Sequence, residues 1–417
     1  MKIKFKIDYR IFLLVLMLVI GGVIVRPIIY IALLITLMLV LFSNEYETIL
    51  LLFFLFPFAT IFKLSAGSGS LFTYIELLVV CKFLFTKKIS KSVFLGWIFY
   101  SLYIVLGTGN AITDCVKQMI LPLLIYYILK YSEKDNLRIY SDYYIVSMIL
   151  SSTLGYFQKY ISNLSIFINT KQDHLGQGEY ITRFSGLWGD PNYYTVNLIL
   201  CLTIIIYFLS KKIYSTKKAV IFSAPLIIFG ALTGSKSFLL MLAVVLVWMI
   251  ISLVKQKRYI LASISIVGIV VFAVLLMRGN ISIFDNVLIR LNETKGNITT
   301  GRTSLWGKYI IYFMEHPFKL FIGNGLGKGY TFSAPHSIYI DYLDFYGILG
   351  TSIFLVCIYN CLKKYEKRFI FINYMPLIAV LILYANLSMI RYLDYGFQIS
   401  LALAFICNRK EQNIYGK

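Results

Sequence analysis

Residues 302–350 read RTSLWGKYIIYFMEHPFKLFIGNGLGKGYTFSAPHSIYIDYLDFYGILG. This stretch starts as a polar, basic segment, passes through a glycine-rich run at 323–329 and reaches an apolar segment that begins beside His336. A change from polar to apolar sequence is typical of a chain that enters a bilayer. We expect the remainder of the sequence to be membrane-embedded scaffold that holds this stretch at one face of the bilayer.

The composition excludes an ordinary soluble protein. Of the 417 residues, 59% are hydrophobic and 14% are charged, and the mean hydropathy is +0.78. Soluble proteins carry about 25% charged residues. Apolar runs long enough for helical spans recur from end to end, and the sequence lacks the short alternating segments of a β-barrel. The sequence therefore predicts an all-α polytopic membrane protein with a single integral-membrane domain over residues 1–417.

The apolar runs predict about fourteen membrane spans, or about twelve if the first two runs are short or re-entrant. They lie near residues 11–25, 27–43, 48–63, 72–86, 93–107, 116–131, 142–158, 193–210, 219–233, 235–253, 259–277, 337–361, 369–388 and 393–407.

The basic residues fall on alternate connections between these spans. Most of the 40 Lys and Arg residues lie at the two termini and in the connections near 82–91, 130–138, 211–218, 255–258 and 363–368. This alternation follows the positive-inside rule, which places both termini in the cytoplasm. The formal net charge of +21 therefore reflects membrane topology, and we do not expect nucleic acid as a partner.

Two connections are long, near residues 159–192 and 278–336, and both are predicted to be extracytoplasmic. The predicted inner connections are short, and the sequence contains no Walker-type loop that would bind a nucleotide. Chemistry is therefore expected at the outer face, without ATP. The six cysteines form no paired CxxC motif, so we expect them to act as small hydrophobic residues and expect no metal site.

The first long connection ends in RFSGLWGDPNYY, residues 183–194. Arg183 offers a planar fork of donors that suits phosphate, although contact with lipid headgroups is an alternative. Asp190 and Asn192 follow a tight turn, where either residue could cap the next helix or line a substrate site. Lys236, in the short sequence TGSKS at 233–237, could neutralise a phosphate or extend to lipid headgroups.

The second long connection carries more basic than acidic residues. The basic residues are Arg278, Arg290, Lys295, Arg302, Lys308, Lys319 and Lys328, and the acidic ones are Asp285, Glu293 and Glu315. Basic residues are usually scarce on the outer face, so this excess indicates an anionic partner, for which a lipid-linked pyrophosphate is the natural candidate. The glycine-rich run could bring backbone N–H groups close to such an anion, or it could be a flexible loop.

His336 stands after Pro335 at the predicted start of a span. An imidazole there could take a proton from a sugar hydroxyl, and the alternative is a role in capping the helix. Asp341 and Asp344 follow within the same span. Charged residues inside a span face the bundle interior or a wet cavity, so both carboxylates are candidates to line a substrate site.

Five ordered motifs resemble the O-antigen polymerase/ligase superfamily of bacterial envelope enzymes, which includes Wzy-type polymerases and the related O-antigen ligases. The matching segments are RFSGLWGDPN at 183–192, TGSKS at 233–237, GRTSLW at 301–306, PFKLFIGNGLG at 317–327, and HSIY at 336–339 with Gly347 and Gly350. The resemblance covers about residues 180–350. The family often has Asn where this chain has Ser337, and Arg where it has Lys236.

The resemblance implies an outer-face glycosyltransferase that needs neither metal nor another cofactor and uses an undecaprenyl-pyrophosphate-linked glycan as donor. It also implies that Arg183 and Arg302 hold the pyrophosphate while His336 activates the acceptor hydroxyl. The expected partners are lipid-linked oligosaccharide repeat units and membrane lipid, with a chain-length regulator as a further candidate. The expected location is the bacterial cytoplasmic membrane.

Within this superfamily, the Tyr-rich and Ile/Lys-rich character of the chain favours a repeat-unit polymerase for O-antigen or capsule. Such an enzyme transfers the growing glycan from its lipid pyrophosphate to a hydroxyl of the next lipid-linked repeat unit. One alternative is an O-antigen ligase. Another, from a different class, is a lipid-linked oligosaccharide flippase or transporter, although transporters favour inverted repeats and broken helices near the midplane.

Overall fold

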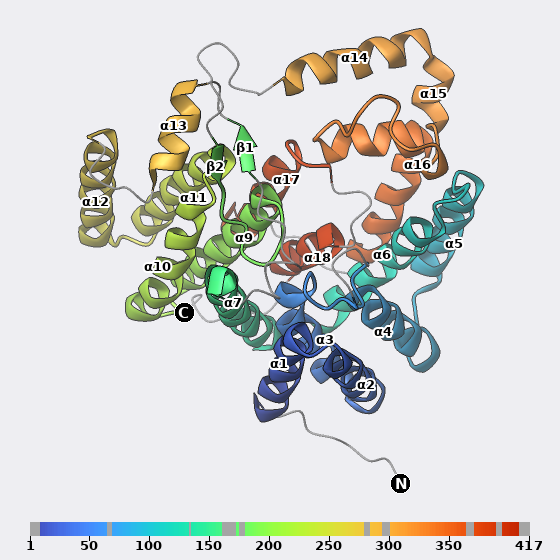
Figure 1. The fold of residues 1–417 in the computed structure, drawn as a ribbon, viewed down its shortest axis with the longest axis horizontal. Helices are drawn as coiled ribbons and strands as arrows, with labels where there is room; N and C mark the ends of the chain where they lie inside the picture. Colours follow the sequence, from blue (N-terminus) through green and yellow to red (C-terminus); the bar gives the residue numbers. More distant parts are fainter. Residues whose placement is uncertain are drawn as a thin grey trace.

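The computed structural model describes residues 9–64, 69–132, 135–160, 172–174, 180–278, 284–293, 301–363, 371–388 and 394–407. Helices make up nearly all of the regular structure in these ranges (Figure 1). The one sheet found there is an antiparallel hairpin of β1 (Gln172–His174) and β2 (Tyr180–Thr182). The predicted all-α fold is therefore confirmed.

Each predicted span contains a helix. These helices are α1 (Tyr9–Ile24), α2 (Pro27–Phe42), α3 (Glu45–Leu55) with η1 (Phe56–Phe58), α4 (Phe72–Thr86), α5 (Lys91–Leu106), α6 (Ile112–Tyr131), α7 (Asp135–Tyr156) with η2 (Phe157–Tyr160), α9 (Pro191–Ser210), α10 (Thr216–Leu232), α11 (Lys236–Lys255), α12 (Tyr259–Met277), α16 (Ile338–Leu362), α17 (Phe371–Tyr384) and α18 (Asp394–Cys407).

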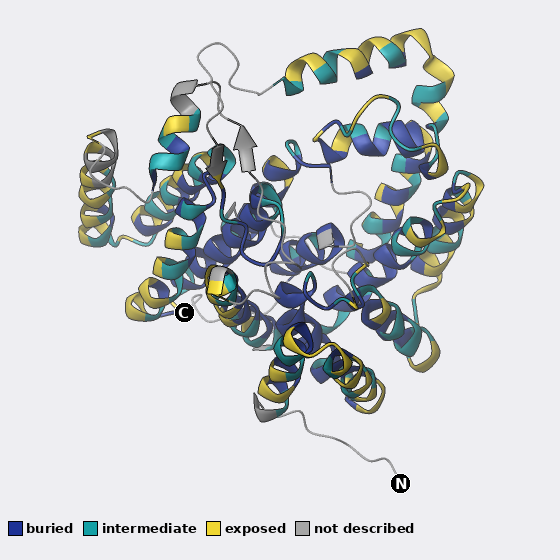
Figure 2. Ribbon diagram, viewed as in Figure 1, coloured by how far each residue is buried: buried dark blue, intermediate teal, exposed yellow. Residues whose placement is uncertain are grey.

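Among the described residues, four helices are long and apolar enough to cross a membrane, namely α6, α9, α11 and α16. Several shorter helices are also apolar, and their outer faces are exposed (Figure 2). On α12, for example, 80% of Ile260 and 62% of Val267 are exposed. Large apolar surfaces of this kind are costly in water and favourable against lipid. The chain is therefore a polytopic membrane protein, as predicted.

The second long connection contains helices that the apolar runs did not predict. It contains α13 (Asp285–Glu293), α14 (Arg302–Glu315), α15 (Pro317–Ile322) and the short η5 (Leu326–Lys328). In Figure 1, α14 extends along one edge of the molecule and α15 returns towards α16. Pro317 suits the first turn of α15 because that position needs no N–H donor, and Gly323, with φ +77°, ends the helix.

Local sequence fixes where several helices begin. Asn44 and Glu47 form a reciprocal capping box at the start of α3. The hydroxyl groups of Ser215 and Ser235 accept bonds from the first turns of α10 and α11. These caps satisfy N–H groups that have no partner within the helix, and so they set the boundaries of the apolar runs.

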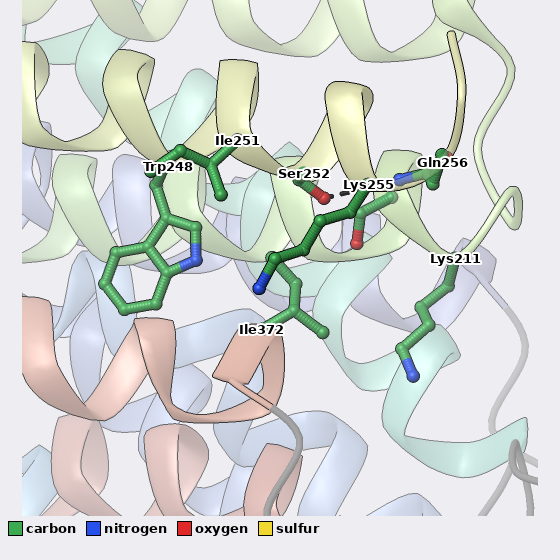
Figure 3. Close-up of a pocket in the computed structure, with 8 residues that line it drawn as sticks. Lys211, Trp248, Ile251, Ser252, Lys255, Gln256 and Ile372 are labelled. Atoms are coloured by element: carbon green, nitrogen blue, oxygen red, sulfur yellow. Dashed lines mark hydrogen bonds between the residues drawn. The ribbon is translucent and has the colours of Figure 1, made fainter.

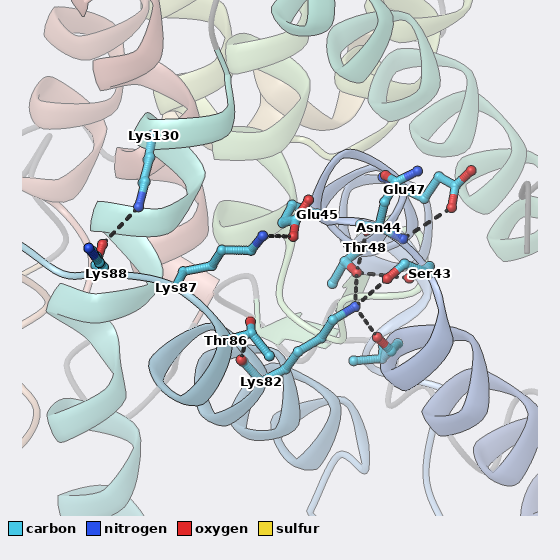
Figure 4. Close-up of polar contacts among 11 residues, drawn as sticks. Ser43, Asn44, Glu45, Glu47, Thr48, Lys82, Thr86, Lys87, Lys88 and Lys130 are labelled. Atoms are coloured by element: carbon cyan, nitrogen blue, oxygen red, sulfur yellow. Dashed lines mark hydrogen bonds and ion pairs between the residues drawn. The ribbon is translucent and has the colours of Figure 1, made fainter. Parts of the chain in front are cut away.

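Connections that were predicted on the same side of the membrane contact one another. At the predicted inner side, Lys82 donates from Nζ to the main-chain oxygens of Val40 and Ser43 at 2.5 and 2.6 Å (Figure 4). Lys87 forms an ion pair with Glu45 beside it. The connections near 44 and 82–88 therefore lie at one face of the bundle.

The predicted outer connections meet in the same way. Arg26 donates from Nη1 to the main-chain oxygen of Leu64 at 2.6 Å. The backbone N–H of Gly327 donates to the oxygen of Gly107 at 3.1 Å. These contacts support the alternation of the connections, and which face is cytoplasmic stays a prediction. The basic residues Lys134, Lys364, Lys367, Arg368 and most of those at the termini lie outside the described residues.

The core contains polar side chains bonded to one another between apolar layers. α9 is buried on almost every side, and its Asn197 accepts from the Tyr144 hydroxyl at 2.7 Å and from Nε2 of Gln398 at 2.8 Å. Gln398 in turn accepts from the Tyr384 hydroxyl at 2.6 Å. This network joins α7, α9, α17 and α18. Helices inside a membrane gain little from the hydrophobic effect when they associate, so hydrogen bonds of this kind help to hold them together.

Candidate active site

Arg183 lies at the end of the first long connection and is 1% exposed. Its Nε donates to the main-chain oxygen of Thr233 at 2.9 Å, and its Nη2 donates to Oδ1 of Asn192 at 3.2 Å. One guanidinium therefore joins the residues after β2, the first turn of α9 and the turn between α10 and α11.

A second arginine binds the same turn. Arg290 of α13 donates from Nη1 to the main-chain oxygen of Gly234 at 2.6 Å, next to the carbonyl that Arg183 holds. Gly234 has a φ of +59°, which glycine adopts without strain. The two guanidinium groups therefore hold successive carbonyls of the turn at 233–235, and we call these residues with Arg183 and Arg290 the clasped turn.

Asp190 and Asn192 take different roles at the start of α9. Asp190 is the N-cap, and its Oδ1 accepts from the backbone N–H of Asn192 at 2.7 Å. The Oδ1 of Asn192 accepts from Arg183 and from the Ser235 hydroxyl, both at 3.2 Å. Asp190 therefore takes the capping role, one of the two roles left open for these residues. Asn192 instead bonds to Arg183 and Ser235 of the clasped turn.

Arg302 begins α14 and is partly exposed. Its Nη1 lies 3.2 Å from the main-chain oxygen of Asn386 and 3.4 Å from the Oδ1 of the same residue. Burial lowers the pKa of the Arg302 guanidinium from its ordinary value, Asp190 opposes that shift, and Arg290 adds to it. Asn386 is two residues before Ser388, whose main-chain oxygen accepts from the Tyr193 hydroxyl next to Asn192, so Arg302 lies near the clasped turn.

His336 is exposed and has a φ of +51°. Lys212 and Lys257 also have positive φ, but each directly follows the end of a helix, where the left-handed conformation is common. His336 instead precedes α16, whose N-cap is Ser337, so His336 itself does not take the N-cap position. A strained backbone that helix geometry does not explain is typical of functional sites.

α14 connects His336 with Arg302. Trp306 lies four residues after Arg302, one turn along the same face of α14. Its Nε1 donates to the main-chain oxygen of Pro335 at 2.7 Å, directly before His336. One helix therefore supports both the guanidinium at its start and the backbone that carries the imidazole.

Asp341 is fully buried in the first turns of α16. Its Oδ1 accepts from the Ser388 hydroxyl at 2.9 Å, and the main-chain oxygen of Ser388 accepts from the Tyr193 hydroxyl at 2.7 Å. This chain of bonds ties α16 to the start of α9, next to Asn192. Asp341 is therefore linked to the clasped turn through the residues that follow α17.

Asp344 holds the segment that follows the glycine-rich run. Its Oδ1 accepts from Nδ2 of Asn324 at 2.9 Å and from the Thr331 hydroxyl at 2.5 Å, and its Oδ2 accepts from the Thr331 N–H at 3.1 Å. Burial raises the pKa of Tyr309 on α14, and the negative charge of Asp344 raises it further. Tyr309 therefore remains a neutral phenol. Asp344 thus fixes the loop against α16 and α14.

The glycine-rich run packs against protein backbone. Gly323, Asn324, Gly325, Gly327, Lys328 and Gly329 each donate their N–H to a main-chain oxygen. A Cβ on Gly325 would lie 2.6 Å from the oxygen of Gly107, and a Cβ on Gly323 would lie 2.4 Å from the oxygen of Phe345. The glycines thus allow the run to lie close to the end of α5 and to α16, and those N–H groups are engaged within the protein.

The two predicted lysines lie apart from one another. Lys236 is the first residue of α11, adjacent to the clasped turn, and is partly exposed. Lys328 is exposed and lines a separate open cleft of about 530 Å³, which it shares with Asn110 and Asp114. Of the two, only Lys236 adjoins Arg183. Among the described residues, no group of three or more His, Cys, Asp or Glu side chains could hold a metal ion.

Several residues of this region were not singled out from the sequence. Arg290 was one basic residue among many in its connection, and Tyr193, Asn386 and Ser388 carry no recognisable motif. Bonds identify them: Arg290 donates to the turn, Asn386 accepts from Arg302, Ser388 donates to Asp341, and Tyr193 donates to Ser388. A signal for Arg290 did exist, because it stands three residues after the buried apolar Val287 in a short amphipathic helix.

Comparison with known proteins gives one match. A family model described as O-antigen ligase matches residues 219–355, from α10 into α16. That segment includes Lys236, Arg290, Arg302 and His336, and it begins after Arg183. No curated protein and no solved structure matches the chain. The match covers about a third of the chain and supports a membrane enzyme of the O-antigen ligase/polymerase superfamily, without separating ligase from polymerase.

Proposed function

We propose that the chain is a repeat-unit polymerase of a bacterial surface polysaccharide, acting at the outer face of the cytoplasmic membrane. The donor is a glycan linked to undecaprenyl pyrophosphate, and the acceptor is a hydroxyl of another lipid-linked repeat unit. In the reaction, a bond forms between the anomeric carbon of the donor and the acceptor oxygen. The bond between that carbon and the pyrophosphate oxygen breaks, and the lipid pyrophosphate leaves as an anion.

The observation that carries this proposal is the shared support of Arg302 and His336 by α14, beside the clasped turn. The bond from Trp306 to Pro335 and the electrostatic contact of Arg302 with Arg290 and Asp190 connect these groups. A cationic group and a histidine that are supported by one helix suit a reaction whose leaving group is a diphosphate and whose nucleophile is a hydroxyl.

We assign the direct grip on the diphosphate to Arg302, because it is partly exposed and its planar guanidinium can donate two parallel bonds. Arg183 is almost fully buried, so its main contribution is to fix the clasped turn and to add positive charge to it. Direct phosphate binding by Arg183 stays a prediction from the sequence. Lys236, at the edge of the turn, adds charge, Asn192 orients Arg183, and Asp190 caps the helix that carries Asn192.

His336 takes the proton of the acceptor hydroxyl as the new bond forms. Its exposure leaves room for a sugar, and the positive φ fixes the direction in which the imidazole leaves the backbone. Asp341 and Asp344 act as supports of this segment, through Ser388 and Thr331. The energy of the reaction comes from the bond between glycan and pyrophosphate, so no nucleotide is required.

Ligase activity is the second candidate, because the matched model carries the description O-antigen ligase. Ligase and polymerase share the donor and differ in the acceptor, which is a repeat unit for a polymerase and a different lipid-linked glycan for a ligase. The same arginines and histidine would serve either reaction.

The phenotype of a deletion strain tests the choice. Loss of a polymerase leaves surfaces that bear single repeat units. Loss of a ligase leaves long glycans on the lipid pyrophosphate carrier, and loss of a flippase leaves repeat units facing the cytoplasm. The proposal predicts the first result, with long chains restored by the wild-type gene and not by His336→Ala. Either of the other two results would overturn the polymerase assignment.

A further inference from the structure

A basic cavity lies at the opposite end of α9 and α11 from the clasped turn. Its volume is about 230 Å³, and it opens between the C-terminal ends of α9 and α11 and the start of α17 (Figure 3). Its polar lining includes Lys211, Ser252, Lys255 and Gln256. This is the side of the molecule where the positive-inside rule predicts the inner leaflet.

The charge of the cavity lining is positive. Two lysines line the cavity, and none of the lining residues that the structure describes is acidic. Lys211 follows the last residue of α9, and Lys255 is the last residue of α11, so both ammonium groups come from neighbouring helix ends. In Figure 3 their long side chains extend from two different elements along the cavity.

Backbone N–H groups close the C-terminal ends of both helices. The carbonyls in the last turn of α9 accept from the backbone N–H groups of Lys211 and Lys212. Those of α11 accept in the same way from Gln256 and Lys257. Because backbone donors already close both helix ends, the ammonium groups are not required to satisfy these carbonyls.

The remaining lining suits the part of a lipid next to its headgroup. Trp248 is mostly buried and faces the cavity with the apolar side chains of Ile251 and Ile372. Tryptophan is enriched at the boundary between membrane and water because its ring is apolar and its N–H is polar. Gln256 donates from Nε2 to the Ser252 hydroxyl at 3.3 Å and holds the polar wall in place.

We propose that this cavity binds the phosphate headgroup of an anionic membrane phospholipid, with the ammonium groups of Lys211 and Lys255 on the phosphate and Trp248 against the glycerol and upper acyl chain. Basic pockets between membrane helices on the cytoplasmic side are suited to such headgroups. The site is separate from the clasped turn and does not depend on the reaction that the protein performs.

The experiment uses the full-length protein in a neutral detergent and measures its affinity for short-chain phosphatidylglycerol by native mass spectrometry. The double variant Lys211→Gln/Lys255→Gln should weaken binding by about 30-fold, since each basic residue near an anionic lipid contributes about fivefold. Each single variant should fall between the double variant and the wild type. The single variants also keep the test informative if the double variant does not fold.

The matched control is Lys212→Gln/Lys257→Gln, which removes the same charge from the same two connections at exposed positions outside the cavity lining. This control should bind phosphatidylglycerol as the wild type does. Phosphatidylcholine and inorganic phosphate serve as ligand controls and should bind at least tenfold more weakly. An equal loss in the control variant, or equal binding of phosphatidylcholine, would overturn the site. Equal binding of inorganic phosphate would show that the cavity binds a soluble anion, and it would overturn the proposal of a phospholipid site.

Discussion

Arg183 donates from its Nε to the main-chain oxygen of Thr233, 2.9 Å away, and so ties the end of the first long connection to the turn between α10 and α11. With the bond from Arg290 to Gly234, this contact gives the membrane-embedded scaffold a rigid, positively charged turn at one face. The proposed chemistry depends on that rigidity as well as on the charge.

Replacement of Arg183 should destabilise the protein. Arg183→Ala leaves the oxygen of Thr233 without the Arg183 donor and removes one of the two donors to Oδ1 of Asn192, which should cost about 1–3 kcal/mol. Arg183→Lys should recover little, because a single ammonium cannot reproduce the two directions of the guanidinium. Thermal unfolding of the purified protein measures both effects. Asn192→Ala removes only one of the two bonds and should cost less, and an Arg183→Ala protein as stable as the wild type would refute the role of the clasped turn.

Replacement of Arg302 should reduce the rate of transfer more than it reduces stability. Its guanidinium is partly exposed and holds Asn386 by long bonds, so folding depends on it weakly. Loss of a group that stabilises developing charge typically lowers the rate by about 10²- to 10³-fold. Glycan chain-length profiles at matched protein levels give the readout. Lys308→Ala, an exposed residue on the same helix, should keep normal chains, and equal profiles for Arg302→Ala and Lys308→Ala would exclude the assignment.

Replacement of His336 should abolish polymer synthesis without lowering the stability of the fold. Asparagine and glycine tolerate positive φ better than most residues, so His336→Asn and His336→Gly should fold with a stability equal to the wild type or up to about 1 kcal/mol higher. Both should nevertheless lose polymer synthesis. His316 stacks on Tyr312 in the same connection and provides the control, because His316→Ala should retain synthesis. Long chains from His336→Asn would show that the imidazole is not the base.

The glycine contacts predict opposite effects at two positions. Gly325 has a φ of +80°, and an added Cβ would lie 2.6 Å from the oxygen of Gly107, so Gly325→Ala should cost at least about 1 kcal/mol. Gly307 lies within α14 and has open space around it, so Gly307→Ala should stabilise the helix by up to about 1 kcal/mol. Melting temperatures of the two variants should move in opposite directions, and a shared direction would count against the packing described.

The buried network around Asn197 should contribute measurably to stability. Asn197→Leu fills similar space but leaves the Tyr144 hydroxyl and the Gln398 amide without their acceptor, at an expected cost of about 1–3 kcal/mol. Thr203→Val on the same helix is the control, because that hydroxyl bonds only within α9, to the oxygen of Leu200. Equal melting temperatures for the two variants would show that the network does not contribute to stability.

Apolar runs sufficed to predict the helices that build the scaffold. A run of such length has few alternatives to a helix in lipid, so the predicted spans and the observed helices agree to within a few residues along most of the chain. The helices α13 to α15 were missed because they are short and amphipathic. Their order depends on contacts with α11 and α16, which a local pattern does not contain.

The roles of the candidate site residues stay predictions, and the structure shows only how these residues are placed. Arg302 and His336 were identified by motif, and the bond from Trp306 to Pro335 relates the two. The sequence of the glycine-rich run is compatible with an anion-binding or a flexible loop, whereas six of its N–H groups donate to main-chain oxygens. Alternating glycines permit close backbone packing as well as anion binding. The close approach of Gly107 to this run shows that the glycines here serve backbone packing, and a local sequence pattern does not contain that contact.

The most direct test of the account is transfer by the purified protein in liposomes that contain its lipid-pyrophosphate-linked repeat unit. Release of lipid pyrophosphate and the length of the lipid-linked glycan are measured together. We expect the wild type to release one lipid pyrophosphate for each repeat unit added, and His336→Ala and Arg302→Ala to release almost none. Undiminished release by His336→Ala, or repeat units that cross the bilayer without elongation, would contradict the account.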